Sequence, residues 1–514
     1  MKPTGCAHIP LLALEEALTI KMSVISRAYE KIRSSVEGVV RAEGLKSTVF
    51  RGGAWLGAGS FLEQAIRFGR NMLLTRLLAP EAFGTMAIVL SATTLIQVLA
   101  EVGAREALIQ SPRGTEEGHI GAAWWMSVGR SLSIYSVIFV LAPFIARFYA
   151  NGELAALARI ATLSIVFDGL LSPRAIVAQK QMKFSKWAVV NNGGGMLGVL
   201  TTILLSYFLR DVWALAIGYC SENAARCILS YIVCPYRPRF SLDVSALRDL
   251  WRFSRGLFGL AFLNLIFTRT DIFVLAKLFS PAKLGLYSMA IYLVQTPTVF
   301  LAAILSQTLL PALSRIQNDH ARMNRILLQV TSATVMLGLP ALVFVAFCGR
   351  SLLTLIYGQR YSLAAAALVL AACASFLNIL NVQLTLMFYA KGLPGLHRRS
   401  VAAMAAVVVV QIYPLSKGFG LWGGQLACLI AVVVGYLLQV ERIRKVTGLR
   451  LTDYFKTFLI PAAASLVIAA VWFVTGSIGA LAQPAPNIMV GVFACLLAYG
   501  LVGLVSLRGA RETV

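Results

Sequence analysis

The sequence has few charged residues for its size. Only 13% of its 514 residues are Asp, Glu, Lys or Arg, whereas 58% are hydrophobic, and the mean hydropathy is +0.76. A chain of this kind has too few polar side chains to cover the surface of a soluble protein. The composition therefore excludes a soluble globular protein and predicts a protein embedded in lipid.

Histidines and paired cysteines are also scarce. The 4 histidines fall in presumed connections or in the N-terminal segment, and the 8 cysteines include no CxxC pair. We therefore expect no metal site, no cofactor and no catalytic residues. The glycine-rich segment Asn191–Gly195 lacks the Lys and Ser/Thr of a phosphate-binding loop, so we interpret it as a close-packing or hinge element of a helix.

Acidic residues are outnumbered, with 22 Asp and Glu against 46 Lys and Arg, which gives a net charge of +24. In a soluble chain this excess would indicate nucleic acid, but here the basic residues lie between apolar runs. Most of them fall in alternate connections, as the positive-inside rule requires of cytoplasmic loops. The pattern predicts that both termini are cytoplasmic, and nucleic acid is not an expected partner.

Apolar runs long enough to cross a bilayer recur along the whole chain. Each is about 20 residues long, the length that spans roughly 30 Å of hydrocarbon. We predict an all-α membrane protein with about fourteen transmembrane helices. The expected spans are 52–78, 82–103, 122–146, 155–178, 188–209, 213–234, 256–279, 285–313, 328–348, 363–390, 400–416, 420–440, 457–476 and 487–507. The two runs on either side of Pro414 and Gly418 could instead form one broken helix.

An internal repeat indicates two related halves. Arg76, Pro80 and Gly84 recur at one constant offset as Lys277, Pro281 and Gly285. Because six helices separate equivalent positions, the halves share one orientation, and such repeats place a substrate site between them. The predicted domains are a cytoplasmic arm (1–50), an N-lobe of six helices (51–234), a basic interfacial linker (235–255), a C-lobe of six helices (256–440) and two C-terminal helices (441–514).

Ionisable and polar side chains lie within several predicted spans, where each Arg costs about 2.5–3.5 kcal/mol at a helix centre. Such residues line a wet cavity or pair with one another. Glu63 could pair with Arg67, and Glu222 with Arg226, each at i, i+4. Arginine also fits an anion, since it stays charged and presents a fork to phosphate oxygens. The candidates are Arg67, Arg70, Arg130, Arg226 and Arg269 for substrate, and Glu63, Asp168, Glu222, Asn264 and Asp271 as polar or coupling groups of the cleft.

Several segments together resemble a known family. Glu101–Gln110, Ala142–Tyr149, Gln179–Phe184 and Leu310–Asp319 are similar, in order and spacing, to the Wzx-type oligosaccharide flippases. These form the polysaccharide-transporter branch of the multidrug/oligosaccharidyl-lipid/polysaccharide exporter superfamily. The resemblance implies two lobes around a central cleft. It also implies that cleft arginines hold the diphosphate of a lipid carrier.

The resemblance further implies alternating-access transport of an undecaprenyl-diphosphate-linked oligosaccharide across the bacterial inner membrane. The cargo would be a repeat unit of an exopolysaccharide or O-antigen, and the partners would include a polysaccharide polymerase and chain-length or export proteins. On this basis Arg67→Ala or Arg70→Ala would abolish polymer export without lowering protein abundance. A cation-coupled drug exporter of the same superfamily and an integral-membrane polysaccharide polymerase remain as alternatives. Against the polymerase alternative, the sequence has no DxD metal-binding motif and no long outer loop in which to build an active site.

Overall fold

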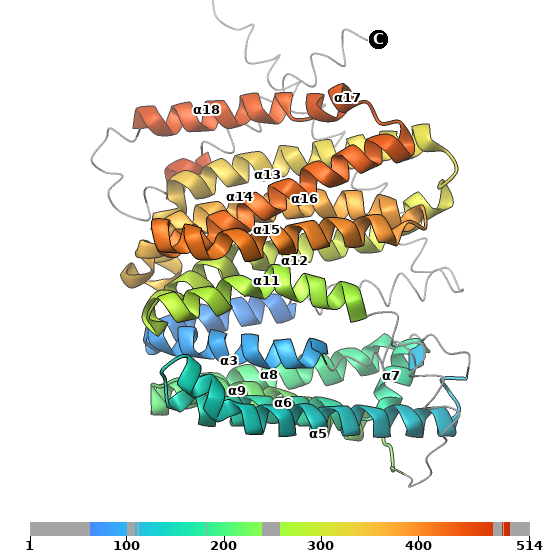
Figure 1. The fold of residues 1–514 in the computed structure, drawn as a ribbon, viewed down its shortest axis with the longest axis vertical. Helices are drawn as coiled ribbons and strands as arrows, with labels where there is room; N and C mark the ends of the chain where they lie inside the picture. The colour runs from blue at the N-terminus through green and yellow to red at the C-terminus, as the bar shows by residue number, and fades with distance from the viewer. Residues whose placement is uncertain are drawn as a thin grey trace, which may run out of the picture.

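The fold of the described residues is a single bundle of long helices (Figure 1). The computed structural model describes residues 62–99, 108–109, 113–181, 183–238, 258–475, 486 and 488–493. Within this part of the chain every regular element is a helix, and no strand occurs. The all-α fold class predicted from the sequence is confirmed.

The helices follow one another in antiparallel succession and fall into two groups. We call the first group, before residue 239, the N-lobe, and the group from α11 to α16 the C-lobe. The N-lobe contains a helix over residues 62–77, α3 (Pro80–Leu99), α5 (Glu117–Phe148), α6 (Glu153–Gly169), α7 (Pro173–Lys180), α8 (Phe184–Leu209) and α9 (Trp213–Val233). The C-lobe contains α11 (Phe258–Leu278), α12 (Pro281–Arg315), α13 (His320–Tyr357), the short η1 (Gln359–Ala364), α14 (Ala365–Ala390), α15 (Pro394–Phe419) and α16 (Leu421–Thr447). Two further helices follow, α17 (Leu451–Lys456) and α18 (Leu459–Thr475).

The length and apolarity of these helices identify an integral membrane protein. Among the described residues, nine helices are long and apolar enough to cross a membrane, or ten if one bent pair counts as a single span. The total of fourteen stays a prediction. The expected arm (1–50) and most of the basic linker lie outside the described residues. The predicted domain boundaries likewise stay predictions.

The bent pair is the fourth predicted span. We expected one helix over 155–178, but the structure has α6 and α7, whose axes differ by 57°. Pro173 is the first residue of α7, and proline disfavours helical backbone in the residue before it and removes one N–H from the helix ladder. By contrast, the region around Pro414 is not one broken span, because α15 and α16 are two separate helices with Gly420 between them.

The connections differ between the two ends of the bundle. At one end they are short and carry no net charge, as at 78–79, 210–212 and 279–280. At the other end lie Lys183 and Lys391, together with basic residues in the flanking helix turns. We call these the short-loop end and the basic end. The positive-inside rule predicts that the basic end faces the cytoplasm.

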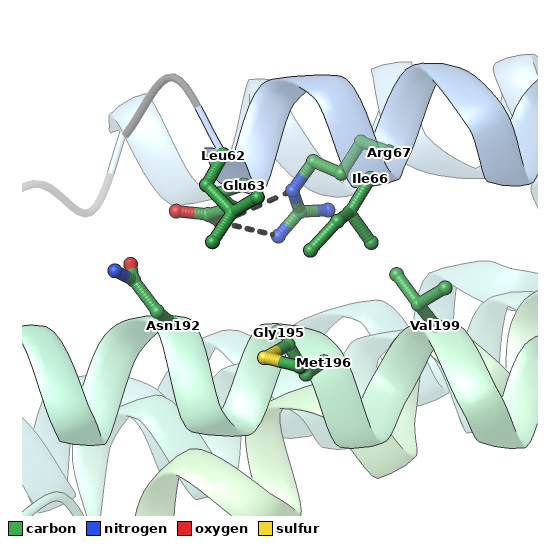
Figure 2. Close-up of a pocket in the computed structure, with 8 residues that line it drawn as sticks. All are labelled: Leu62, Glu63, Ile66, Arg67, Asn192, Gly195, Met196 and Val199. Carbon is green, nitrogen blue, oxygen red and sulfur yellow. Dashed lines mark hydrogen bonds and ion pairs between the residues drawn. The ribbon is translucent and has the colours of Figure 1, made fainter. Parts of the chain in front are cut away.

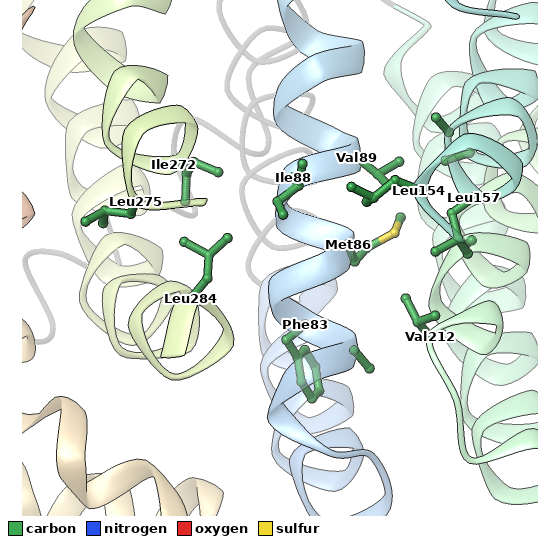
Figure 3. Packing of buried hydrophobic residues seen from close by; sticks show 14 of the residues in the cluster. Phe83, Met86, Ile88, Val89, Leu154, Leu157, Val212, Ile272, Leu275 and Leu284 are labelled. Carbon is green, nitrogen blue, oxygen red and sulfur yellow. The ribbon is translucent and has the colours of Figure 1, made fainter. Parts of the chain in front are cut away.

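The hydrophobic cores show where the two lobes pack against each other. One cluster spans both lobes near the short-loop end, and in Figure 3 α3 lies between Leu154 and Leu157 of the N-lobe and Leu275 and Leu284 of the C-lobe. Near the basic end, the cluster around Leu108 belongs to the N-lobe alone, and the one around Leu313 belongs to the C-lobe with α17. The lobes therefore share a core at the short-loop end and have separate cores at the basic end.

Candidate functional site

A cavity lies between the lobes, as expected for a repeat of this kind. It has a volume of about 340 Å³ and is lined from the 62–77 helix, α3, α8, α9, α11 and α12. Its walls combine charged groups with apolar side chains such as Phe83 and Met86 of α3. The predicted residues that line it are Arg67, Arg70, Glu222, Arg269 and Asp271. The structure thus brings together five of the ten candidates.

Four charged residues at the N-lobe wall form a closed ion-pair network. Arg67 Nη2 lies 2.9 Å from Glu63 Oε1, and Arg226 Nη2 lies 2.8 Å from Glu222 Oε1, so both i, i+4 pairs considered from the sequence are present. Arg67 Nη1 also donates to Glu222 Oε2 at 3.2 Å, which ties the 62–77 helix to α9. Figure 2 shows the Arg67 guanidinium turned back onto Glu63 above Gly195 of α8. Two arginines and two glutamates balance, so the network is electrically neutral.

Glycines in α8 bring this network together. A Cβ on Gly198 would lie 2.8 Å from the Cα of Glu222, and a Cβ on Gly194 would lie 2.9 Å from the Cα of Arg226. Only residues without a side chain allow α8 and α9 to approach so closely. The helix-packing interpretation of the glycine-rich segment is therefore confirmed for Gly194. The close approach holds Glu222 buried, at 4% exposure, behind the cavity wall.

Two glycines of α8, Gly195 and Gly198, provide a test of this packing. We expect Gly198→Ala to destabilise the protein by about 1–3 kcal/mol, the usual cost of overpacking a tight interface. Gly195→Ala is the matched control, because its Cβ would meet Glu63 Oε1 at 3.4 Å, an ordinary contact. Thermal unfolding of the purified proteins in detergent measures the stability of both variants. Equal melting temperatures for the two variants would contradict the packing role of Gly198.

Two other arginines of the cavity are not part of the neutral network. Arg70 is half-buried, and its Nε donates to the neutral amide oxygen of Asn71 at 3.2 Å. Arg269 is exposed at the cavity wall. Within the described residues, neither guanidinium lies within 4.0 Å of a carboxylate oxygen. They come from the first helix of each lobe as described, so each lobe presents to the shared cavity one arginine that is outside the neutral network.

The C-lobe wall holds a buried carboxylate. Asp271 is 8% exposed, and the Tyr287 hydroxyl lies 2.9 Å from its Oδ2 and 3.0 Å from Gln425 Oε1. Sequence reasoning missed Tyr287 and Gln425. Gln425 could have been found as a polar residue inside an apolar span. Tyr287 gave no such signal, because its partner Asp271 lies in another helix.

The remaining candidates do not line the cavity. Glu63 and Arg226 reach it only through the ion-pair network. Arg130 (α5), Asp168 (α6) and Asn264 (α11) are not among its lining residues. Their roles stay predictions. The described part of the chain also contains no cluster of three or more His, Cys, Asp or Glu side chains suited to a metal ion.

A cavity between two repeat-related groups of membrane-spanning helices defines a transporter of the two-lobe class. The family can be named as well, because a family model described as "Polysaccharide biosynthesis protein" matches residues 73–366. The chain belongs to this family. The resemblance seen in the sequence is confirmed.

Two relatives are similar in sequence to this protein over most of the chain. The lipopolysaccharide biosynthesis protein WzxC of Escherichia coli K12 is 21% identical over 445 residues, which cover 84% of this chain and 88% of that protein. The succinoglycan biosynthesis transport protein ExoT of Rhizobium meliloti 1021 is 25% identical over 348 residues, covering 67% of this chain and 69% of ExoT. The relatives are thus named for polysaccharide biosynthesis or its transport step.

Solved structures confirm the transporter fold. The lipid II flippase MurJ in an inward closed conformation superposes with a TM-score of 0.70 at 13% identity, covering 88% of this chain and 99% of MurJ. An inward-facing transporter of the multidrug resistance MATE family has a TM-score of 0.55 at 14% identity, covering 75% of this chain and 96% of that one. At these identities the likeness concerns the fold.

Proposed function

We propose that this protein is a flippase that moves an undecaprenyl-diphosphate-linked oligosaccharide from the cytoplasmic to the outer leaflet of the bacterial inner membrane. The lobes alternate access to the central cavity. The diphosphate binds there, while the lipid tail stays in the bilayer. The cargo is a repeat unit of an exopolysaccharide, O-antigen or similar polymer, in keeping with the names of the relatives.

One observation carries the proposal. Arg70 and Arg269 enter the cavity from opposite lobes and are not neutralised by ion pairs, whereas the other charges of the N-lobe wall cancel. Guanidinium groups present planar forks that match the oxygens of phosphate. A diphosphate offers two phosphoryl groups, so one arginine from each lobe can hold one of them. Such a substrate would link the lobes at the moment of transport.

The alternative of a cation-coupled drug exporter finds less support in this cavity. A cationic drug needs uncompensated acidic side chains, but Glu222 is paired with Arg67 and Arg226. Asp271 is buried and bonded to Tyr287. The remaining arginines would repel a cation. The proposed partners, a polysaccharide polymerase and chain-length or export proteins, would use the flipped repeat unit on the outer side.

Proteoliposomes test the proposal directly. The purified protein is reconstituted with a fluorescent undecaprenyl-diphosphate oligosaccharide, and transfer between leaflets is followed by the fraction of fluorophore that dithionite quenches. We expect transfer of the diphosphate lipid to exceed that in protein-free vesicles by at least about tenfold. A lipid with the same sugar on an uncharged polyprenol is the control and should stay in place. Failure to move the diphosphate lipid, or increased drug susceptibility of a deletion strain with normal polymer, would overturn the proposal.

A further inference from the structure

Two repeat-related glycines cross at the short-loop end. Gly84 lies in the first turns of α3 in the N-lobe, and Gly285 lies in the first turns of α12 in the C-lobe. A Cβ on Gly84 would collide with the carbonyl group of Pro281, with the carbonyl carbon only 2.8 Å away. Conversely, a Cβ on Gly285 would lie 2.7 Å from the carbonyl carbon of Pro80. The two helices therefore meet backbone to backbone, in a reciprocal contact between lobes.

Two repeat-related basic residues flank this crossing. Arg76 of the N-lobe donates from Nη2 to the carbonyl oxygen of Leu355 at 3.2 Å. Lys277 of the C-lobe donates from Nζ to the carbonyl oxygen of Phe148 at 2.5 Å. Both carbonyls lie in the last turn of a helix, α13 and α5, where backbone oxygens have no partner within the helix and the dipole attracts a cation.

The two cation contacts correspond under the repeat. α5 and α13 are each the third helix described in their lobe, so they occupy equivalent places in it. Each lobe thus gives one cation to the other lobe and accepts one at a helix end. The same residues carried the repeat in the sequence: Arg76 with Lys277, Pro80 with Pro281, and Gly84 with Gly285. Repeated residues here do more than preserve a common fold, because each contacts the opposite lobe.

We propose that these contacts form a latch that closes the cavity on the short-loop side, and that opening the latch exposes the cavity to the outside. The proposal rests on the proposed function and on the predicted orientation, which places the short-loop end outside. The shared core lies at this end, so the latch sits where the lobes are closed. A contact present in only one of two conformations shifts their populations when it is weakened.

Cysteine accessibility measures opening without needing substrate. Ser288 lines the cavity and is replaced with Cys in a protein whose 8 native cysteines are changed to Ser. A membrane-impermeant maleimide is then added to right-side-out vesicles, and the labelling rate is recorded. With Gly84→Ala added, we expect at least about tenfold faster labelling, which corresponds to about 1.4 kcal/mol in favour of the open state. Gly129→Ala is the matched control, since a Cβ there meets nothing within 4 Å.

A second variant keeps the test decisive if Gly84→Ala does not fold. Arg76→Gln combined with Lys277→Gln removes both cations and should speed labelling about threefold, because exposed charged contacts contribute less than about 1 kcal/mol each. The exchange Arg76→Lys with Lys277→Arg retains both donors and should label at the starting rate. Unchanged labelling in the folded variants would overturn the latch. Loss of lipid transfer in proteoliposomes with a normal labelling response would instead overturn the proposed substrate.

Discussion

Replacing Arg70 with Ala should abolish polymer export while leaving the amount of protein in the membrane unchanged. Arg70 faces the cavity, and its only hydrogen bond given by the described structure is to neutral Asn71, so no buried carboxylate loses its partner. A hydrogen bond to a charged group contributes about 1.5–3 kcal/mol. Losing it from a bound diphosphate should slow transfer about ten- to hundredfold. Lipid transfer in proteoliposomes and immunoblots of membranes measure the two quantities.

Two further variants define the role of Arg70. Arg70→Lys keeps the charge but loses the fork, so transfer should fall less than with Ala. Arg360→Ala, an exposed arginine of η1 outside the cavity, should transfer lipid at the starting rate. Arg269→Ala should resemble Arg70→Ala, because the proposal assigns each arginine one phosphoryl group. Normal transfer by both Arg70→Ala and Arg269→Ala would contradict the anion site.

Arg67→Met should have a different effect, which is loss of stability. Arg67 pairs with Glu63 and with Glu222, and Glu222 is 4% exposed. Removing one partner of a buried ion pair leaves an uncompensated charge and costs about 3–5 kcal/mol. We expect the lower end of this range, since Arg226 still pairs with Glu222. Reduced abundance and a lower melting temperature in detergent would show the effect.

A double-mutant cycle separates this effect from loss of substrate binding. Arg67→Met combined with Glu222→Gln makes the network neutral again, so the double variant should be more stable than Arg67→Met alone. Lys445→Met is the surface control, because its pair with Glu441 is exposed and surface pairs contribute about 0–1 kcal/mol. If Arg67→Met and Lys445→Met lowered stability equally, the network would have no structural role.

The sequence alone predicted equal behaviour for Arg67→Ala and Arg70→Ala. Helical periodicity places both on one face with Glu63, and the i, i+4 pairing of Glu63 with Arg67 could be read directly. The bond between Arg67 and Glu222 could not be read, because it joins residues 155 positions apart. Such pairing depends on how closely α8 and α9 pack. The structure therefore distinguishes arginines that periodicity leaves equivalent.

The fold itself was largely predictable. Apolar runs must become helices in lipid, where backbone groups need partners within the segment, so most predicted spans agree with helices of the structure. The bend at Pro173 was missed, because apolarity is continuous across it. The repeat of Gly84 and Gly285 was visible, but its reciprocal contact was not. Periodicity describes one helix at a time, whereas contacts depend on how helices from distant segments cross.

The Arg67–Glu222 pair also has a consequence for how the protein is made. The 62–77 helix enters the membrane with Glu63, Arg67 and Arg70 on it, and the polar partner from α9 is synthesised 155 residues later. At about 5–20 residues per second, this delay is roughly 8–30 s. Until α9 is made, Arg67 can pair only with Glu63 on its own helix. The N-lobe wall therefore gains its full set of ion pairs only after α9 has joined the 62–77 helix.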